Sequence, residues 1–442
     1  GAANTDVPVK LESQWKTQLG GRLTQPIIAN GSVFVAAIDA HTVYSLDAGT
    51  GAVQWQFTAA GRVDSPPTYY NGLLLFGSAD GWVYCLRAQD GTLAWQFRAA
   101  PEERRVGAFG QLESAWPVHG TVLIQDGLAY TAAGRSSFLD GGIFVYALNP
   151  ETGAVAHQTV LDGPHPDLSK DIGNPFGMDG VNTDVLVSDG EYLYMMQAMM
   201  DGELNQLDPE RVTNMGDKKF GRHVYSTAGL LNDDWWNRHF WMYAERWPGF
   251  YIGHQASKEG QLLVFDEDTT YGVKCFTKRN VHSPMFFPGT DGYLFFADDN
   301  DAEPALVGDP GVETGLRSFP HQFDRDIIQI DFKTVDIDKS TGFVRTQEPK
   351  WTNWMPLRGR AMVATKNALF IAGPPDVLDP EDPLAAFEGR KGGHLVALSK
   401  QDGEKLAEYN LTSPPVFDGL SAANGHLYLA SRDGKLTCYG EK

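Results

Sequence analysis

Two stretches of sequence that start forty residues apart decide the fold: 42-TVYSLDAGTGAVQW-55 and 82-WVYCLRAQDGTLAW-95. Each begins with alternating apolar residues, passes through a turn that contains Asp, Thr and Gly, and ends in a second apolar stretch that closes on tryptophan. This pattern is typical of an antiparallel β-hairpin. Because one hairpin returns at a fixed interval, the sequence predicts a repeat architecture.

Four further segments carry the same pattern: 144-FVYALNPETGAVAH-157, 332-FKTVDIDKSTGFVRT-346, 394-HLVALSKQDGEKLA-407 and 435-KLTCYG-440. Another short hairpin precedes most of them, as in "GLLLFGSAD" and "GHLYLASRD". Two hairpins per repeat make a four-stranded antiparallel sheet, and a ring of such sheets is a β-propeller. The sequence therefore predicts an all-β propeller.

The number of blades follows from the hairpins that open each repeat. They begin near Val33, Leu73, Leu128, Tyr192, Phe240, Leu294, Leu369 and Leu427. This spacing predicts eight blades, and the irregular fourth and fifth repeats leave seven as the alternative. The last repeat ends at Tyr439 after three strands, so we expect residues 9–19 ("VKLESQWKTQL") to supply its outer strand and close the ring. Residues 1–442 would then form one propeller domain.

Composition agrees with many short strands and excludes some partners. The chain has 442 residues with 48 Gly, 25 Pro and 12% aromatic residues, which predicts tight turns and very little helix. Its formal charge of −20 would repel a phosphate backbone, so nucleic acid is not expected as a partner. No apolar run is long enough to span a bilayer, and the start "GAANTDVPVK" lacks the features of a signal peptide.

The repeat resembles that of the quinoprotein-type (PQQ-like) β-propellers, in which "A-x-D-x-x-T-G-x-x-x-W" closes a blade. Trp55 and Trp95 stand four residues after Gly51 and Gly91, as this tryptophan-docking motif requires. The resemblance implies that each tryptophan is buried in the wedge between its own blade and the next. Later repeats hold other residues at this position, namely His157, Thr346 and Ala407. We therefore expect the docking to be incomplete, with His157 as a filler of the same wedge.

A narrower resemblance involves the phrases "GRVDSPPTYYNG", "ESAWPVHG", "GRSSFLDGG" and "LLNDDWWNRHFWMY". They are similar to segments of PQQ-like repeat proteins from planctomycete-type bacteria, a group with no settled activity. This resemblance implies export to the periplasm or the extracellular space.

Quinone and metal chemistry can be judged from the cysteines and the acidic loops. The quinoprotein dehydrogenases resemble one another in a vicinal cysteine pair, whereas Cys85, Cys275 and Cys438 are far apart in this chain. We expect neither PQQ nor another cofactor, and no zinc site. The acidic segments "DDNDAEP" (298–304) and "DPEDP" (379–383) could collect Ca²⁺ through carboxylate oxygens, with plain solvated loops as the alternative. No metal ligands are assigned.

The candidate ligand site lies at the propeller axis, where the inner strands of all blades begin. Alignment of the repeats predicts that one set of polar side chains converges there: Arg22, Arg62, Asp64, Glu113, Asp184, His282, Arg358, Arg360 and Asp418. Guanidinium groups and carboxylates around one imidazole are typical of a pocket for a polar ligand. The alternative is that these charges pair with one another and with channel water.

A second candidate site is the aromatic stretch 235-WWNRHFWMYAERWPGFY-251. Four of its residues are candidates for stacking against a sugar: Trp235, Trp236, Trp241 and Trp247. The alternative is that alternate residues form a strand and its packing. The irregular segment 163–260 is expected to cover one face of the ring as a loop insertion.

Two functions stay open from the sequence. The first is an exported binding or scaffold module whose axial mouth holds a polar or anionic carbohydrate, another small polar ligand, or a protein partner. The second is a carbohydrate-active enzyme, a polysaccharide lyase or hydrolase, in which arginine neutralises a uronate carboxylate and His282 or a tyrosine abstracts a proton. We favour the first, and no catalytic residue is assigned.

Overall fold

The two hairpins that decide the fold form pairs of antiparallel strands. In the first pair Ser45 lies opposite Trp55, and in the second Cys85 lies opposite Trp95. Both pairs contain a bulge one residue later, at the same point of the repeat. The two repeats therefore share the same strand register and the same local irregularity.

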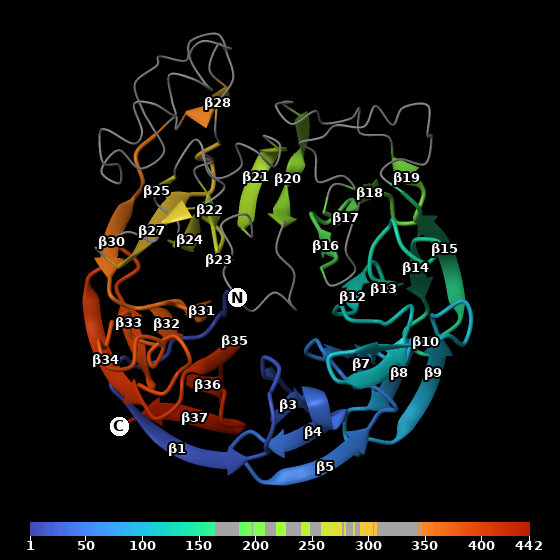
Figure 1. The fold of residues 1–442 in the computed structure, drawn as a ribbon, viewed down its shortest axis with the longest axis horizontal. Helices are drawn as coiled ribbons and strands as arrows, with labels where there is room; N and C mark the ends of the chain where they lie inside the picture. Colours follow the sequence, from blue (N-terminus) through green and yellow to red (C-terminus); the bar gives the residue numbers. More distant parts are fainter. Residues whose placement is uncertain are drawn as a thin grey trace.

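The structure is a computed structural model that describes residues 1–163, 185–196, 198–207, 218–226, 240–247, 258–275, 278–279, 286–287, 292–303, 305–306, 343–344 and 347–442. The sheets stand in a ring around a central axis (Figure 1). Seven of them have four strands and an eighth has three within the described ranges, which makes eight blades. The prediction of an eight-bladed all-β propeller is confirmed. In the described ranges the one helix is the 3₁₀ turn η1 (Ile38–Ala40).

The first three blades are regular four-stranded sheets. The first consists of β2 (Ile27–Ala29), β3 (Ser32–Ala37), β4 (Thr42–Asp47) and β5 (Val53–Thr58). The second consists of β6 (Thr68–Tyr70), β7 (Leu73–Gly77), β8 (Trp82–Arg87) and β9 (Leu93–Arg98). The third consists of β12 (Leu123–Gln125), β13 (Leu128–Ala133), β14 (Ile143–Leu148) and β15 (Val155–Leu161).

The next three blades are less regular. The fourth consists of β16 (Val187–Ser188), β17 (Leu193–Met195), β18 (Ala198–Met200) and β19 (Gln206–Leu207). The fifth consists of β20 (Lys218–Ser226), β21 (Trp241–Trp247) and β22 (Glu259–Gly260). The sixth consists of β23 (Leu262–Phe265), β24 (Thr269–Lys274), β27 (Tyr293–Asp299) and β30 (Trp351–Met355). The segment 163–260 thus contains seven described strands, which belong to two blades.

The last two blades close the ring. The seventh consists of β31 (Ala361–Ala364), β32 (Leu369–Gly373), β33 (Gly393–Leu398) and β34 (Lys405–Leu411). The eighth consists of β35 (Pro415–Ala423), β36 (His426–Ser431), β37 (Lys435–Glu441) and β1 (Leu11–Gln18). β1 pairs antiparallel with β37, with Leu11 opposite Glu441. The predicted closure by the N- and C-terminal strands is confirmed, and it pairs the outer side of β37, which three strands alone would leave as a free edge.

Three short hairpins are added to the ring. They are β10 (Arg105–Ala108) with β11 (Gln111–Ser114), β25 (Lys278–Arg279) with β26 (Phe286–Phe287), and β28 (Ala305–Leu306) with β29 (Phe343–Val344). The first of these follows the outer strand of the second blade and precedes the inner strand of the third. It therefore displaces the start of the third blade along the sequence, which matters for the site.

The sixth blade corrects the repeat alignment. The hairpin expected to begin near Leu294 as the second strand is instead β27, the third strand, because β23 and β24 come before it. The echo at 332–346 contributes only β29 to the described residues, and β29 belongs to an added hairpin. Length and apolar alternation alone do not distinguish strands of one blade from those of an inserted hairpin.

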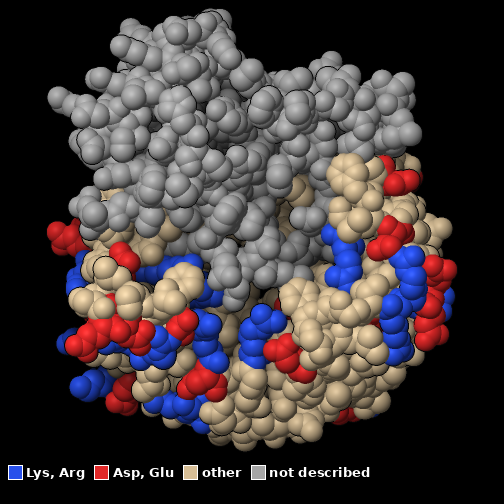
Figure 2. All heavy atoms as spheres, in the orientation of Figure 1, with Lys and Arg blue, Asp and Glu red and all other residues tan. Residues whose placement is uncertain are grey.

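Burial explains why the strands of one blade differ in sequence. Second strands such as β7 and β32 are apolar and almost entirely buried. The outer strands β5 and β9 alternate between exposed and partly buried residues, because one of their faces meets solvent. Figure 2 shows that acidic and basic side chains are intermingled on the drawn face rather than separated by sign.

Tryptophan side chains join neighbouring blades. The indole of Trp55 donates a hydrogen bond from Nε1 to the carbonyl of Ala88 at 3.0 Å, and Trp95 does the same to Pro150 at 2.9 Å. Two further indoles make the same contact, those of Trp15 with Ala48 and of Trp351 with Lys400. The sequence alignment missed both of these.

Burial of these indoles differs from the expectation. Trp55 and Trp95 are half-buried rather than buried, because their outer strands face solvent. Trp15 and Trp351 are buried. The wedge contact therefore recurs after the second blade, at Trp351, and it also joins the closing strand β1 to the first blade.

Candidate functional site

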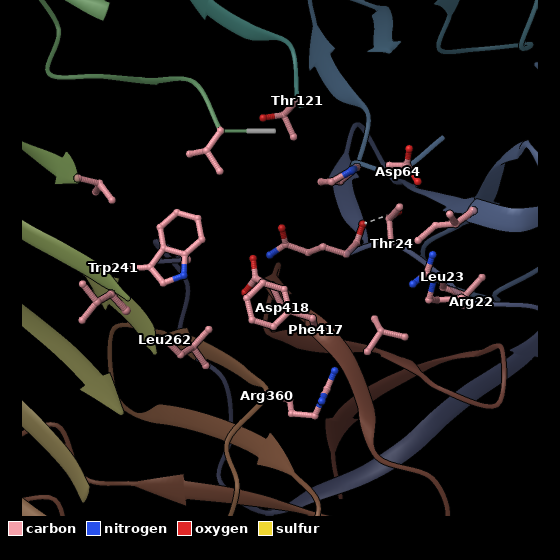
Figure 3. A pocket seen from close by; sticks show the side chains of 18 of the residues that line it. Arg22, Leu23, Thr24, Asp64, Thr121, Trp241, Leu262, Arg360, Phe417 and Asp418 are labelled. Carbon is pink, nitrogen blue, oxygen red and sulfur yellow. Dashed lines mark hydrogen bonds between the residues drawn. The ribbon is translucent and has the colours of Figure 1, made fainter. Parts of the chain in front are cut away.

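The axis of the ring holds a cavity of about 620 Å³. Its described lining comes from all eight blades, mostly from their inner strands and the turns before them. Figure 3 shows Trp241 and Leu262 on one side of this cavity, with Thr24, Asp64 and Arg22 on the opposite side. A volume of this size lies in the range of small-molecule sites.

Backbone hydrogen bonds establish which residues occupy equivalent positions around the axis. Three carbonyls at the same point of the first three blades accept an N–H from the end of the blade's second strand: those of Arg22, Arg62 and Pro117. The residues two positions later are Thr24, Asp64 and His119. All three are buried near the axis. The structure thus assigns His119, and not Glu113, to the ring position of the third blade.

Arg62, Asp64 and Glu113 form a buried ion-pair network beside the cavity. Arg62 is 1% exposed, and its Nε and Nη2 atoms donate to the two carboxylate oxygens of Asp64 at 3.2 and 3.1 Å. Its Nη2 also lies 3.4 Å from Oε2 of Glu113, which is 2% exposed. Arg135 pairs with the other oxygen of Glu113. Glu113 reaches this network from the added strand β11.

His119 completes the network on the side of Asp64. Its Nδ1 atom lies 2.6 Å from Oδ2 of Asp64, and the imidazole is 5% exposed. Burial opposes ionisation of Asp64, but the contacts with His119 and Arg62 outweigh it, so the pKa of Asp64 lies below its ordinary value. Asp64 is therefore an ionised carboxylate whose charge is already compensated.

Two arginines at equivalent positions are covered by phenylalanines from inserted loops. The guanidinium of Arg62 lies 4.0 Å from the ring centre of Phe109, at the tip of the β10–β11 hairpin. The guanidinium of Arg358 lies 4.2 Å from the ring centre of Phe387, in the loop between β32 and β33. Both phenylalanines are more than half exposed, so each ring shields an arginine from solvent with one face only.

Arg22 occupies the same position in the first blade without such a cover. Its side chain is 44% exposed, and its one described ion pair is a long contact of 3.9 Å with Asp39. No hydrogen bond from its guanidinium is formed within the described ranges. Arg22 therefore presents hydrogen-bond donors to the cavity.

Arg360 and Asp418 line the cavity from the seventh and eighth blades. The backbone N–H of Asp418 donates to the carbonyl of Arg360 at 2.9 Å, which joins the two strands. Asp418 has a positive φ of 52°, and a bulge in β35 accompanies it. Burial raises the pKa of Asp418, which favours its neutral form.

The structure separates the predicted mouth residues into groups. Arg22, Asp64, Arg360 and Asp418 line the cavity. Arg62 and Glu113 lie behind Asp64 in the buried network, and Arg358 lies under Phe387. Asp184 and His282 lie outside the described residues. The segment that contains His282 follows β24, so it does not precede an inner strand as the alignment assumed.

Of the predicted stacking residues, Trp241 lines the cavity. It stands at the first position of β21 and is half-buried. Trp235 and Trp236 lie outside the described residues, and Trp247 lies in β21, where only its backbone is described. Trp241 is therefore the aromatic residue from this stretch that contributes a described surface to the cavity.

Sequence reasoning missed several residues at or beside the cavity. They include His119, Thr121, Phe417 and Arg432. His119 was hidden because the β10–β11 hairpin carries "QLES", which imitates the start of an inner strand six residues too early. The signal that could have found it is the spacing of His119 to β12, which equals the spacing of Asp64 to β6.

Metal and quinone binding can be tested against the donor atoms present. Within the described residues no three His, Cys, Asp or Glu side chains gather where they could hold a metal ion. In the two acidic segments, Asp301 and Glu303 pair with Arg222, and Asp379 pairs with Lys391. The cysteines are buried and lie in three different blades. The vicinal cysteine pair of the quinoprotein enzymes has no counterpart here, so these residues do not fit a quinone site of that kind.

Comparison with known proteins agrees with this architecture. Residues 11–210 match the family model described as outer membrane protein assembly factor BamB. No curated protein sequence matches the chain at a significant level. No helix in the described ranges combines the length and the apolar character needed to cross a membrane.

Solved structures with a similar fold include an assembly factor and two enzymes. BamB from Moraxella catarrhalis is 14% identical with a TM-score of 0.50, over 98% of each chain. The quinohemoprotein alcohol dehydrogenase of Comamonas testosteroni is 13% identical with a TM-score of 0.55, over 100% of this chain and 79% of that one. The dehydrogenase ADHIIG of Pseudomonas putida HK5 is 12% identical with a TM-score of 0.54, over 97% and 76%. At these identities the likeness concerns the fold alone, that of a PQQ-like β-propeller.

Proposed function

We propose that this propeller is a binding module and that its axial cavity holds a small anionic ligand. The observation that carries the proposal is the position of Arg22, which lines the cavity with a guanidinium that forms no hydrogen bond within the described ranges. Arginine presents several N–H donors in a fixed plane, a geometry that suits carboxylate, sulfate and phosphate groups.

The charge balance of the cavity supports an anionic ligand. Arg22 lines the cavity, and its one described ion pair is the 3.9 Å contact with Asp39. The carboxylate of Asp64 on the same lining is compensated by Arg62 and His119. An anion beside Arg22 would therefore meet a guanidinium and no uncompensated charge on Asp64.

We also propose that the protein acts outside the cytoplasm, in the periplasm or the extracellular space, as the PQQ-like resemblance implies. The matching family model describes an assembly factor of the outer membrane, which supports this location. A protein partner at the same mouth is a variant of the proposal, because an anionic side chain or chain end could occupy the cavity in place of a small molecule.

The test is titration calorimetry with gluconate, galacturonate and hexanoate at low ionic strength. We expect at least one to bind, and we expect Arg22→Ala to weaken it by about 1.5–3 kcal/mol, the value of a hydrogen bond to a charged group. Arg87→Ala is the matched control, because its exposed guanidinium pairs with Asp90 at 2.6 Å and does not line the cavity. Equal losses in both variants, or no binding to the wild type, would refute the proposal.

A carbohydrate-active enzyme is the second candidate, and one observation favours it. Asp64 lines the cavity and holds the imidazole of His119 at 2.6 Å, an arrangement that orients a general base. The test is release of unsaturated products from polygalacturonate, monitored by ultraviolet absorbance. His119→Gln should abolish the release if His119 acts in this way, and an inactive wild type removes the candidate.

A further inference from the structure

The cavity has two walls of opposite character. On one side, blades four to six contribute only apolar side chains to the described lining, and six of them define what we call the apolar wall: Leu186, Val224, Trp241, Leu262, Leu263 and Phe265. On the other side, Arg22, Thr24 and Asp64 define what we call the charged wall (Figure 3). Figure 3 shows Trp241 and Leu262 across the cavity from Thr24, Asp64 and Arg22.

The apolar wall disfavours a ligand that is polar on all sides. Hydroxyl groups placed against Trp241 and Leu262 would lose hydrogen bonds to water, and these side chains offer almost none in return. An apolar group at the same place would instead be removed from water at a gain in free energy. The part of the ligand that faces this wall is therefore apolar.

The charged wall specifies the other end of the ligand. Arg22 carries a guanidinium without a hydrogen bond in the described ranges, and the carboxylate of Asp64 is already bound to Arg62 and His119. An anionic group beside Arg22 would thus meet donors rather than a competing free carboxylate. A carboxylate on an apolar body satisfies both walls at once.

We propose that the ligand of this cavity is amphipathic, an organic acid whose carboxylate binds Arg22 and whose apolar body packs on Trp241 and Leu262. This inference rests on the proposed function and replaces the acidic sugar expected from the sequence by a hydrocarbon acid. The same chemistry occurs in a free aliphatic acid and in the C-terminus of a peptide that ends in apolar residues, and the test distinguishes these two sources.

The decisive comparison uses three six-carbon probes in titration calorimetry. Hexanoate and gluconate share the chain length and the carboxylate but differ in hydroxyl groups, whereas hexanamide keeps the chain and lacks the charge. We expect hexanoate to bind at least about tenfold more tightly than gluconate, because its chain has no hydroxyl groups to desolvate. Hexanamide should bind at least about tenfold more weakly than hexanoate, because it cannot form a charge-assisted contact with Arg22.

A chain-length series tests the apolar wall without any substitution. Affinity should rise by about fourfold for each methylene from hexanoate to octanoate, the gain for a buried CH₂ group. Trp241→Gln should flatten this series and leave the affinity for gluconate unchanged. Trp82→Gln is the control, because Trp82 is also partly buried and does not line the cavity.

A pentapeptide with apolar C-terminal residues and its amidated form assign the source. If the free-acid peptide binds more tightly than octanoate, the ligand is the C-terminus of a peptide, and the reverse order indicates a free aliphatic acid. Both orders support the inference if the amidated peptide binds more weakly than the free-acid peptide. If gluconate binds as tightly as hexanoate and Arg22→Ala abolishes both, the amphipathic ligand is refuted while the anion site stands. If no acid binds, both proposals fail.

Discussion

The contact between a tryptophan of one blade and a glycine of the next makes a quantitative prediction at Gly91. Gly91 closes the turn between β8 and β9 with a φ of +70°, and a Cβ placed on it would lie 2.6 Å from Cε3 of Trp55. Gly91→Ala therefore adds two costs, the left-handed backbone conformation and the collision with the indole. Gly72 has a similar φ of +82°, but a Cβ there would have no neighbour within 4 Å.

The difference between these two glycines isolates the blade-to-blade contact. Gly72→Ala should lower the free energy of unfolding by about 1 kcal/mol, the usual cost of a non-glycine residue in this region. Gly91→Ala should lower it by about 2–4 kcal/mol, because overpacking adds roughly 1–3 kcal/mol to the same backbone strain. Trp55 is half-buried and exposed on one side, so the indole can move and the lower end of this range is expected.

The assay is urea unfolding followed by circular dichroism, completed by a double-mutant cycle with Trp55→Ala. Removing the indole removes the collision, so Gly91→Ala should cost only about 1 kcal/mol in that background. The two substitutions should thus be non-additive, while Gly72→Ala and Trp55→Ala should add. Equal effects of Gly72→Ala and Gly91→Ala in the wild type, or full additivity at Gly91, would refute the reasoning.

Three further variants test the ring closure, the ion pair of Asp64 and the raised pKa of Asp418. Deletion of residues 1–19 should lower the melting temperature, because it removes β1, which pairs with β37 and contains the buried Trp15. Leu112→Ala, which alters an exposed side chain, should lower it less. An unchanged melting temperature after the deletion would contradict the closure. Asp64→Asn should cost about 3 kcal/mol near neutral pH, the lower end of the cost of breaking a buried ion pair, since Glu113 still lies 3.4 Å from the guanidinium of Arg62. The pKa of Asp64 is lowered in the folded protein, so the difference in the free energy of unfolding between the wild type and Asp64→Asn should shrink as pH falls below about 3.8. A difference that stays constant over this pH range would contradict the ion pair. The pKa of Asp418 is raised, so the wild type should lose stability relative to Asp418→Asn as pH rises above about 3.8. Urea unfolding midpoints measured as a function of pH check both predictions. A wild type that gains stability relative to Asp418→Asn with rising pH would contradict the raised pKa.

Most of the fold could be predicted from the sequence because its signal is local and repeated. The hairpin of residues 42–55 contains the strand alternation, the turn and the tryptophan in fourteen consecutive positions. Closure could be predicted as well, because a three-stranded last repeat needs an outer strand from elsewhere. The sixth blade was misaligned, because an inserted hairpin has the same period as the strands that it interrupts.

The site was harder to predict because it depends on distances between blades. The repeat alignment was six residues too early in the third blade, so it assigned Glu113 instead of His119 to the position at the axis. Both side chains nevertheless reach the network around Arg62 and Asp64. Nothing in the sequence distinguishes Arg22 from Arg62, since each precedes an inner strand by a similar spacing. Only the structure shows that Phe109 and the ion pairs occupy the guanidinium of Arg62 and leave that of Arg22 to the cavity.

The acidic character of the whole chain and the basic character of the cavity act over different distances. A net charge of −20 is spread over the surface, and salt screens it beyond about 8–10 Å at physiological ionic strength. Inside the cavity the lower dielectric makes nearby guanidinium groups dominate, so an anion that arrives there is held by Arg22 rather than repelled by the distant surface. The negative field of the surface lowers the rate at which any anion reaches the cavity. The choice among anions then depends on the groups in direct contact with the ligand, and the described side chains opposite Arg22, such as Trp241 and Leu262, are apolar (Figure 3).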